Sequence, residues 1–348
     1  MSRIIIGLSG GVDSALAAAL LLERGFDVRG VYLKFDDGSG SCPSKEDLAM
    51  ARRVAAHLDI PLRVQDVSAQ YEEQVLAPMR RGYAAGITPN PDTWCNRSVK
   101  FAQLAAIADA VGASAIATGH YARSRNDGRR CVTLLRAADC IKDQTYFLWE
   151  LTQAQLARAV FPIGAYTKEQ VRAMARARGL PNWDRRSTRG VCFLGKKDFS
   201  AYLAQTIAPE PTAVVTTAGE RVGAVEMGQS FTIGQRIRLS GQPVPRYVVA
   251  RDMGARTITV TAAPDDPARD ATQLIATGTS WFGHAPAFGS CEARIRHRQD
   301  PQPCTITAAG ARLLVRFDAP QRGIAPGQAI VFSRADCVLG GANIAHAV

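Results

Sequence analysis

A glycine- and serine-rich octapeptide, Gly7-Leu8-Ser9-Gly10-Gly11-Val12-Asp13-Ser14, contains the residue types that bind phosphate. It follows an apolar run, Ile4–Ile6, and precedes an alanine- and leucine-rich stretch at 15–22. This order is typical of a buried strand, a tight turn and a helix. Glycines let the backbone approach an anion closely, and the first amides of a helix donate to phosphate oxygens. The two serines add hydroxyl groups, and the aspartate could orient the loop or hold Mg²⁺.

The spacing of this octapeptide fits neither the G-x-x-x-x-G-K-[ST] phosphate loop nor the G-x-G-x-x-G dinucleotide fingerprint. It resembles the S-G-G-x-D-S pyrophosphate loop of the ATP pyrophosphatase superfamily. Members of that superfamily split ATP into AMP and pyrophosphate while activating an oxygen for substitution. An ordinary strand-to-helix turn would account for two of the glycines but not for the whole octapeptide. The resemblance implies that ATP, with Mg²⁺, is a co-substrate.

Two of the eight cysteines lie in electropositive surroundings. Cys95 comes just ahead of a predicted helix at 98–111, with Arg97 and Lys100 nearby, so we expect its pKa to be lowered. Cys192 has basic residues on both sides. Taken alone, each cysteine is equally well interpreted as a buried structural thiol. The cysteines show no C-x-x-C spacing, so a zinc ribbon or a haem attachment site is not indicated.

The first half of the chain alternates strand-like and helix-like segments, which predicts a doubly wound α/β domain with a parallel sheet. Because ligands bind at the carboxyl edge of such a sheet, we expect Ser9–Ser14 and Thr118–His120 to lie together. A Thr-x-x-Gln capping pattern opens a further predicted helix at 167–179. The predicted strands are 3–8, 28–35, 62–66 and 115–118, and the other predicted helices are 14–24, 44–58 and 71–81.

The second half of the chain has a different sequence pattern, in which short β-like runs are separated by Gly, Pro and Asp. Seams near 207–211 and 277–286 predict an ATP pyrophosphatase-like catalytic domain at 1–207, a small β-rich central domain at 208–277 and a C-terminal β-barrel at 278–348. From Cys291 to Arg298 apolar residues alternate with charged ones, which predicts a strand with three arginines on one face. That face is either solvated or in contact with a polyanion.

The net charge of +11, from 42 basic and 31 acidic residues, suits a polyanionic partner such as RNA. An arginine-rich solvated surface is the alternative interpretation. The apolar runs are too short to cross a membrane, and the chain enters a strand almost at once, which argues against a signal peptide. The expected location is the cytoplasm.

Seven segments in family order make the chain resemble the bacterial tRNA 2-thiouridylases, which replace the C2 oxygen of the wobble uridine (U34) with sulfur. The resemblance extends over nearly the whole chain and implies that tRNA is the substrate. The matching segments are Gly7–Ser14, Thr88-Pro89-Asn90-Pro91-Asp92 with Cys95-Asn96, Ala117–Tyr121, Lys142–Leu148, Val191-Cys192-Phe193, Ile233–Arg236 and Pro326-Gly327-Gln328.

The resemblance also implies the role of each matching residue. Cys192 would carry a persulfide, loaded by a sulfur-carrier protein or a cysteine desulfurase. Cys95 would act as the second thiol and close a Cys95–Cys192 disulfide when sulfur is released. The implied ATP-binding residues are Gly7, Leu8, Ser9, Gly10, Gly11, Val12, Asp13, Ser14, Leu33 and Gly119. The implied tRNA-binding residues are Asn90, Pro91, Asp92, His120, Lys142, Asp143, Gln144, Arg296, His297 and Gln328.

Several of these assignments have alternatives. Asn90-Pro91-Asp92 also suits a turn, and His120 could be a core histidine. Asp92, Cys95 and Cys192 could instead hold an iron–sulfur cluster, although no compact ligand spacing favours it. The chain departs from the family pattern at Ser187-Thr188, where Asp-Ser is usual, and at Leu33, where methionine is usual.

Two other classes of function compete with uridine thiolation. Another ATP-dependent ligase with the same loop would need no pair of thiols. An RNA-binding protein with a degenerate catalytic site would need neither the intact loop nor the cysteines.

Overall fold

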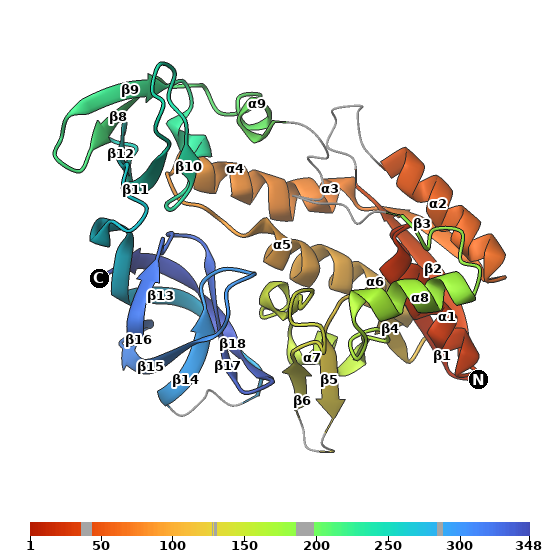
Figure 1. Cartoon of the computed structure of the whole chain (residues 1–348). Helices are drawn as coiled ribbons and strands as arrows, with labels where there is room; N and C mark the ends of the chain where they lie inside the picture. Colours follow the sequence, from red (N-terminus) through yellow and green to blue (C-terminus); the bar gives the residue numbers. More distant parts are fainter. Residues whose placement is uncertain (36–43, 127, 129–130, 186–197, 284–287) are drawn as a thin grey trace.

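The computed structural model describes residues 1–35, 44–126, 128, 131–185, 198–283 and 288–348. Within them the chain forms a parallel sheet covered by helices, a five-stranded mixed sheet and an eight-stranded antiparallel sheet (Figure 1). This order confirms the predicted α/β domain, β-rich central domain and C-terminal β-barrel. No helix in these ranges is both long and apolar enough to span a bilayer.

The parallel sheet has the strand order β3-β2-β1-β4-β7, so the chain winds outward from β1 in both directions. All four pairings are parallel. This confirms the doubly wound topology, and the four predicted strands match four of the five observed. The bounds are β1 Arg3–Gly7, β2 Asp27–Lys34, β3 Leu62–Asp66, β4 Ala115–Ala117 and β7 Ala159–Val160.

The two faces of this sheet are covered by different helices because side chains alternate along each strand. Ile4 and Ile6 pack in one core cluster with apolar residues of α1, α2 and α8. Ile5 packs in another cluster with Phe101 and Leu104 of α6 and with α7. The helix bounds are α1 Val12–Glu23, α2 Ser44–His57, α6 Phe101–Ala110, α7 Gln153–Arg158 and α8 Lys168–Ala177. The predicted Thr167–Gln170 capping box is present at the start of α8.

Two helical segments of this domain are longer than predicted because each includes a π-helical turn. The first consists of α3 Ser68–Tyr71, η1 Glu72–Leu76 and α4 Ala77–Ala84. The second consists of α5 Pro91–Trp94, η2 Cys95–Lys100 and α6. The second segment begins seven residues before the predicted start at Ser98, with Pro91 at its first position, where a missing backbone N–H costs little. Cys95 is therefore inside the helical segment, and its predicted place ahead of the helix is wrong.

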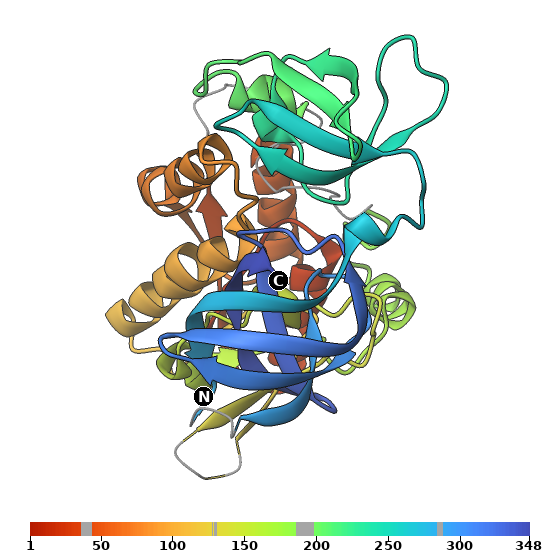
Figure 2. The same cartoon turned by 90° about the vertical axis from the view of Figure 1, so that its left-hand side faces the viewer.

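The central sheet has the strand order β10-β11-β12-β8-β9 and its own apolar core of Val214, Ile237, Leu239, Val248, Ile258 and Val260. A short helix, α9 Phe199–Leu203, precedes it. In Figure 2 this sheet stands above the barrel, which faces the viewer. The bounds are β8 Thr212–Thr216, β9 Arg221–Val225, β10 Arg236–Ile237, β11 Arg246–Asp252 and β12 Thr257–Thr261.

The C-terminal sheet closes into a barrel because β13 pairs with both β16 and β18. The predicted domain boundary at 277/278 falls inside β13, whose pairing with β16 begins at Asp270. β14 ends at Arg294, so the alternating pattern predicted to continue to Arg298 leaves the sheet there. The bounds are β13 Asp270–Trp281, β14 Gly289–Arg294, β15 Gln302–Ala309, β16 Arg312–Arg322, β17 Ala329–Arg334 and β18 Cys337–Ala347.

A hairpin from the first half of the chain extends the barrel sheet. Its strands are β5 Arg123–Asn126 and β6 Val132–Leu135, and β6 pairs with β18 through Leu135 and Cys337. The catalytic domain and the barrel therefore share one continuous hydrogen-bonded sheet.

Candidate active site

The octapeptide loop lies between β1 and α1 and is shaped by close backbone contacts. Gly10 has a φ of +78°, and a Cβ atom there would come within 2.4 Å of the Asp47 carbonyl oxygen. A Cβ atom on Gly119, just after β4, would come within 2.5 Å of the Ser14 backbone nitrogen. The predicted proximity of Thr118–His120 to the loop is therefore confirmed, and glycine is required at both contacts.

The two serines of the loop stabilise its turn. The Ser14 Oγ donates to the Gly11 carbonyl oxygen at 3.0 Å and accepts from the Ser9 backbone N–H at 3.2 Å. Ser9 itself is exposed, so its hydroxyl can reach a ligand. These hydrogen bonds stabilise the loop at the carboxyl edge of β1, where the first turn of α1 provides backbone N–H groups of the kind that bind anions.

The segment 182–185, which follows α8, contacts the other side of the loop. Asn182 Nδ2 and Arg185 Nη1 both donate to the Gly10 carbonyl oxygen, at 2.9 and 3.1 Å. Arg185 Nη2 also reaches Asp47 Oδ1 at 2.5 Å. Asn182 is almost completely buried. The loop is therefore held in place by α2 and by the segment 182–185, as well as by hydrogen bonds within the loop itself.

Asp13, in the first turn of α1, is held by two side chains from distant parts of the chain. The Tyr121 hydroxyl donates to Asp13 Oδ1 at 2.8 Å, and Lys168 Nζ donates to the same oxygen at 2.6 Å. Lys168 is buried, so its charge lies beside the loop rather than in solvent. Burial and the neighbouring Asp13 carboxylate raise the pKa of Tyr121, which keeps its hydroxyl protonated as a donor.

The turn Thr118–His120, at the carboxyl end of β4 and next to the loop, contributes to a second group of polar residues. His120 Nδ1 hydrogen-bonds Thr118 Oγ1 at 2.8 Å, and its ring stacks on Phe101 with centroids 5.8 Å apart. Burial, followed by the charge of Lys100, lowers the pKa of His120 to about 3. His120 is therefore a neutral imidazole at physiological pH.

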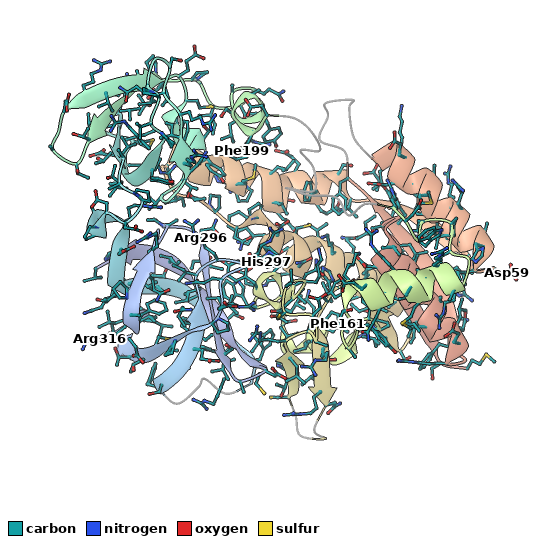
Figure 3. All side chains as sticks on the ribbon, in the orientation of Figure 1. Asp59, Phe161, Phe199, Arg296, His297 and Arg316 are labelled. Atoms are coloured by element: carbon teal, nitrogen blue, oxygen red, sulfur yellow. The ribbon has the colours of Figure 1, made fainter. Side chains whose placement is uncertain are left out.

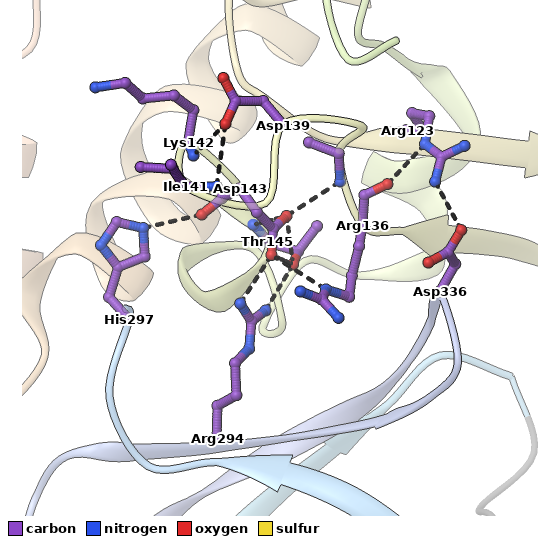
Figure 4. Close-up of polar contacts among 11 residues, drawn as sticks. Arg123, Arg136, Asp139, Ile141, Lys142, Asp143, Thr145, Arg294, His297 and Asp336 are labelled. Carbon is purple, nitrogen blue, oxygen red and sulfur yellow. Dashed lines mark hydrogen bonds and ion pairs between the residues drawn. The ribbon is translucent and has the colours of Figure 1, made fainter. Parts of the chain in front are cut away.

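Asp92 belongs to the same region, because Lys100 and His297 both act on its carboxyl group. Burial raises the pKa of Asp92, and electrostatic interactions with Lys100 and then with His297 oppose the rise. His297 reaches the catalytic domain from the side of the barrel (Figure 3). Its Nε2 lies 2.9 Å from the Asp143 carbonyl oxygen (Figure 4). Its ring packs against Phe147 with centroids 4.4 Å apart. The charge of Lys100 thus acts on two of the predicted tRNA-binding residues, Asp92 and His120, and a third, His297, acts on Asp92.

Cys95 lies on the same helical segment but is buried in an apolar cluster. Its neighbours in that cluster include Val75, Leu76, Met79, Val99 and Leu203. Cys192 lies outside the described residues, so the pairing of the two thiols stays a prediction, as does the cluster-binding alternative with Asp92.

Asp143 and Gln144, two of the predicted tRNA-binding residues, are engaged inside the protein. Asp143 is buried, and its Oδ2 accepts from Arg294 Nη1 at 2.8 Å, while Thr145 donates to both of its carboxylate oxygens (Figure 4). Gln144 Oε1 accepts from the Tyr121 backbone N–H at 2.9 Å. The Lys142 ammonium, in contrast, points away from this cluster (Figure 4). Of the three side chains, only that of Lys142 points away from these internal contacts, and RNA binding by it stays a prediction.

Arg296 and Gln328 also bind other parts of the protein. Arg296 Nη2 donates to the carbonyl oxygens of Ile233 and Gly323, at 2.7 and 2.9 Å, although much of the side chain remains exposed. Gln328 Nε2 donates to the Thr88 carbonyl oxygen at 3.0 Å. Both residues therefore join domains, and RNA contacts by them stay a prediction.

Thr88, two residues before Asn90-Pro91-Asp92, is a point where all three domains meet. Its backbone N–H donates to the Pro326 carbonyl oxygen at 2.8 Å. Its Oγ1 lies 2.8 Å from Thr232 Oγ1 and 3.1 Å from Arg251 Nη2, both in the central domain. The approach to the predicted base-binding motif is therefore fixed by the relative placement of the domains.

Comparison with known proteins identifies the family. Family models described as the tRNA methyl transferase HUP domain, the tRNA methyl transferase PRC-barrel domain and the aminomethyltransferase beta-barrel domain match residues 2–196, 200–262 and 271–344. The tRNA-specific 2-thiouridylase MnmA of Alkalilimnicola ehrlichii is 42% identical, covering 98% of this chain and 97% of that protein. Those of Dichelobacter nodosus and Nitrosomonas eutropha are 40% and 39% identical, covering 98% and 100% of this chain and 93% and 99% of those proteins. The chain belongs to the tRNA-specific 2-thiouridylase family.

Sequence reasoning missed several residues that shape the site of this 2-thiouridylase family member. Lys168 gave a weak signal as a basic residue at the start of a helix, where an acidic one is favoured. The sequence indicated Arg294 only as one of three arginines on the charged face of a predicted strand. For the others no local signal existed, because their partners are far away in sequence. The missed residues are Lys168, Asn182, Arg185, Arg251 and Arg294.

Replacing Lys168 with methionine should weaken ATP binding to this thiouridylase by about 10- to 150-fold, because a charged hydrogen bond worth roughly 1.5–3 kcal/mol is lost beside the loop. Titration calorimetry with Mg-ATP measures the change in Kd. Arg178→Met is the matched control, since Arg178 pairs with Glu23 at the far ends of the same two helices. An equal loss of affinity in both variants would contradict the assignment of Lys168 to the nucleotide site.

The lowered pKa of His120 predicts a pH-dependent contribution to stability. Between the ordinary histidine pKa of 6.5 and about 3, the unfolded chain binds a proton at this residue and the folded chain does not. Stability must therefore fall as the pH drops below about 6.5. Urea unfolding at pH 7 and pH 5 should show a smaller fall for His120→Asn than for the unsubstituted protein. The same fall in both proteins would show that His120 titrates normally in the folded state.

Proposed function

We propose that this chain replaces the C2 oxygen of the wobble uridine (U34) of tRNA with sulfur, using ATP to activate that oxygen and a persulfide on Cys192 to deliver the sulfur. One observation supports the proposal most strongly. The turn Thr118–His120 contacts the octapeptide loop 7–14, called the nucleotide loop from here on, through Gly119. His120, the last residue of that turn, is one of the polar residues Asp92, His120 and His297. A nucleotide and a base bound at these two places would lie side by side at one edge of the sheet.

The nucleotide loop would bind the phosphates of ATP through its backbone amides and through Ser9. Asp13 is an oxygen ligand of the kind that Mg²⁺ prefers, and Lys168 and Tyr121 both engage its Oδ1, so Oδ2 is the oxygen that would hold the ion. Among the described residues no cluster of three or more His, Cys, Asp or Glu could hold a metal. Bound there, Mg²⁺ would neutralise the charge of the leaving pyrophosphate.

The reaction then divides into an activation and a displacement. The uridine O2 attacks the α-phosphorus, pyrophosphate leaves, and an adenylated base results. The terminal sulfur of the Cys192 persulfide attacks C2, and AMP leaves with the original oxygen. The Cys95 thiolate attacks the Cys192 sulfur, which breaks the S–S bond to the base and leaves 2-thiouridine and a Cys95–Cys192 disulfide. A thiol reductant restores the two cysteines for the next cycle.

Recognition of the target base would fall to Asn90, Asp92 and the residues around them. Asn90 is buried at the start of α5, where it can present its amide to a base drawn out of the anticodon loop. Neutral His120 can donate or accept a hydrogen bond but adds no charge. Lys142 would contact the RNA backbone. Because tRNA and ATP are the proposed substrates, we expect the enzyme to act in the cytoplasm.

The test supplies purified protein with tRNA, Mg-ATP, a cysteine desulfurase and radiolabelled cysteine. We expect label in the wobble uridine with the unsubstituted protein and with Cys337→Ala, and none with Cys192→Ala. Pyrophosphate release that depends on tRNA should persist in Cys192→Ala, because activation precedes sulfur transfer. Cys95→Ala should stop after attack on C2, with the sulfur still bonded to Cys192.

Two results would overturn the proposal. If tRNA binds and the donor is active but no sample incorporates sulfur, the enzyme catalyses another adenylating reaction or only binds RNA. If Cys192→Ala incorporates sulfur at the normal rate, Cys192 is not the carrier.

A further inference from the structure

Two cysteines that the proposed reaction does not use lie opposite each other in the C-terminal barrel. Cys291 of β14 and Cys304 of β15 are direct partners in the antiparallel register. Their Sγ atoms are 3.6 Å apart, and both are free thiols. Cys304 is buried in the barrel core, whereas Cys291 is only partly buried and packs against the edge of that core.

The positions of the two residues suit a disulfide bond. Directly opposed residues in antiparallel strands have Cα atoms about 4.5–5.5 Å apart, which falls within the span of about 4.4–6.8 Å found in disulfides. Because an S–S bond is about 2.0 Å long, the sulfurs need to approach by only about 1.6 Å. Rotation of the two side chains can supply that distance without moving the strands.

The two thiols are not chemically equivalent. A hydrogen bond from Cys304 lowers the pKa of Cys291, and the positive charge of Arg334 acts in the same direction against burial and Glu292. The same sulfur–sulfur hydrogen bond, in which either thiol can be the donor, together with burial and the charges of Cys291, Asp318 and Glu292, raises the pKa of Cys304. Cys291 is therefore the thiolate that reacts first, and Cys304 is the thiol that follows.

We propose that Cys291 and Cys304 form a reversible oxidation site, at which a hydroperoxide converts the two thiols into a disulfide. The Cys291 thiolate attacks the terminal peroxide oxygen, the O–O bond breaks, and the departing oxygen takes a proton and leaves as an alcohol or water. Cys291 is then a sulfenic acid. The Cys304 sulfur attacks the Cys291 sulfur, and the hydroxyl leaves as water with the Cys304 proton. Two thiols lose two electrons, and the hydroperoxide gains them.

Oxidation at this place would tie together the base of a loop that joins the barrel to the other domains. The loop between β14 and β15 includes Arg296, which binds the Ile233 carbonyl oxygen, and His297, which binds that of Asp143. A bond between Cys291 and Cys304 closes this loop covalently. We expect the oxidised protein to melt at a higher temperature than the reduced protein, because the unfolded chain is constrained.

Peptide mapping of the full-length protein tests the proposal directly. Arg294, Arg296 and Arg298 separate the two cysteines, so trypsin places them on different peptides. After hydrogen peroxide and alkylation of the remaining thiols, mass spectrometry should find the two peptides joined, and dithiothreitol should release them. Cys304→Ser should accumulate a sulfenic acid on Cys291 that dimedone traps. Cys291→Ser should leave Cys304 reduced, because the first step is lost.

Cys140, an exposed thiol, serves as the internal control for the oxidant. If Cys140 is fully oxidised while Cys291 and Cys304 both remain open to alkylation after unfolding, the proposal is wrong. It is also wrong if Cys291 joins a cysteine other than Cys304. This experiment needs neither tRNA nor ATP. A failure of the oxidation proposal would therefore not contradict the proposed thiolation, and a failure of the thiolation proposal would not contradict the oxidation.

Discussion

Gly119→Ala is expected to lower the rate of ATP-dependent tRNA thiolation about 100-fold, since a displacement of roughly 1 Å at a reacting group can have an effect of that size. The added Cβ would lie 2.5 Å from the Ser14 backbone nitrogen, 2.7 Å from the Asp13 carbonyl carbon and 2.8 Å from the Ser14 Cα. All three are backbone atoms, so no flexible side chain can move aside. The turn and the nucleotide loop must separate, and the ATP phosphates move away from the base.

Rates measured over a range of ATP concentrations at saturating tRNA separate this effect from a general loss of stability. The control is Gly112→Ala, at a glycine with φ +63° and open space around its Cα. It should destabilise the fold by roughly 1–2 kcal/mol through the left-handed backbone alone, with little change in rate. A Gly119→Ala enzyme that turns over as fast as Gly112→Ala would show that the loop is not held by this contact.

Arg294→Met should destabilise the protein by about 3 kcal/mol, the lower end of the loss expected when a buried ion pair keeps only one partner, because Arg136 still lies 3.7 Å from Asp143. Both side chains of the Arg294–Asp143 pair are almost completely buried, with Nη1 and Oδ2 2.8 Å apart. Removing the guanidinium leaves the buried Asp143 carboxylate with hydrogen bonds from Thr145 and the Ala137 backbone N–H and with a longer ion pair to Arg136, whose Nε lies 3.7 Å from Oδ2. The barrel would then separate more easily from the catalytic domain.

Urea unfolding, followed by tryptophan fluorescence, measures the shift in the midpoint. Arg322→Met is the matched control, because Arg322 pairs with Asp270 on the surface of the same barrel, and its loss should cost less than about 1 kcal/mol. The double variant Arg294→Met/Asp143→Leu should recover part of the stability, since both charges are then removed. Equal midpoints for Arg294→Met and Arg322→Met would contradict a buried-pair role.

The features that the sequence predicted correctly are local ones. Ile4–Ile6 and the following glycines specify a strand and a turn within a few residues of one another. Gly25 and Gly112, just after the ends of α1 and α6, have φ values of +79° and +63°, as glycines at helix ends commonly do. Thr167 and Gln170 form a capping box because they are three residues apart. In each case the residues that determine the conformation are neighbours in the chain.

The features that could not be predicted depend on partners far away in sequence. Alternation in β14 indicates which residues share a face, but not that Asp143, 151 residues away, covers Arg294. Lys168 and Asp13 are 155 residues apart. The predicted helix start near Cys95 was wrong because Pro91 begins the helical segment, and a proline followed by an aspartate suits a turn as well as a first helical turn.

The pairing of β6 with β18 also has a consequence for folding during synthesis, because the two strands are far apart in the sequence. Residues 132–135 leave the ribosome more than two hundred residues before β18, which is the last strand of the chain. Until then the β5–β6 hairpin has an unpaired edge, which is a site for unwanted association. A catalytic domain that has already folded must therefore wait for the end of the chain to cover that edge. Release of a shortened chain lacking β18 would leave the edge open permanently.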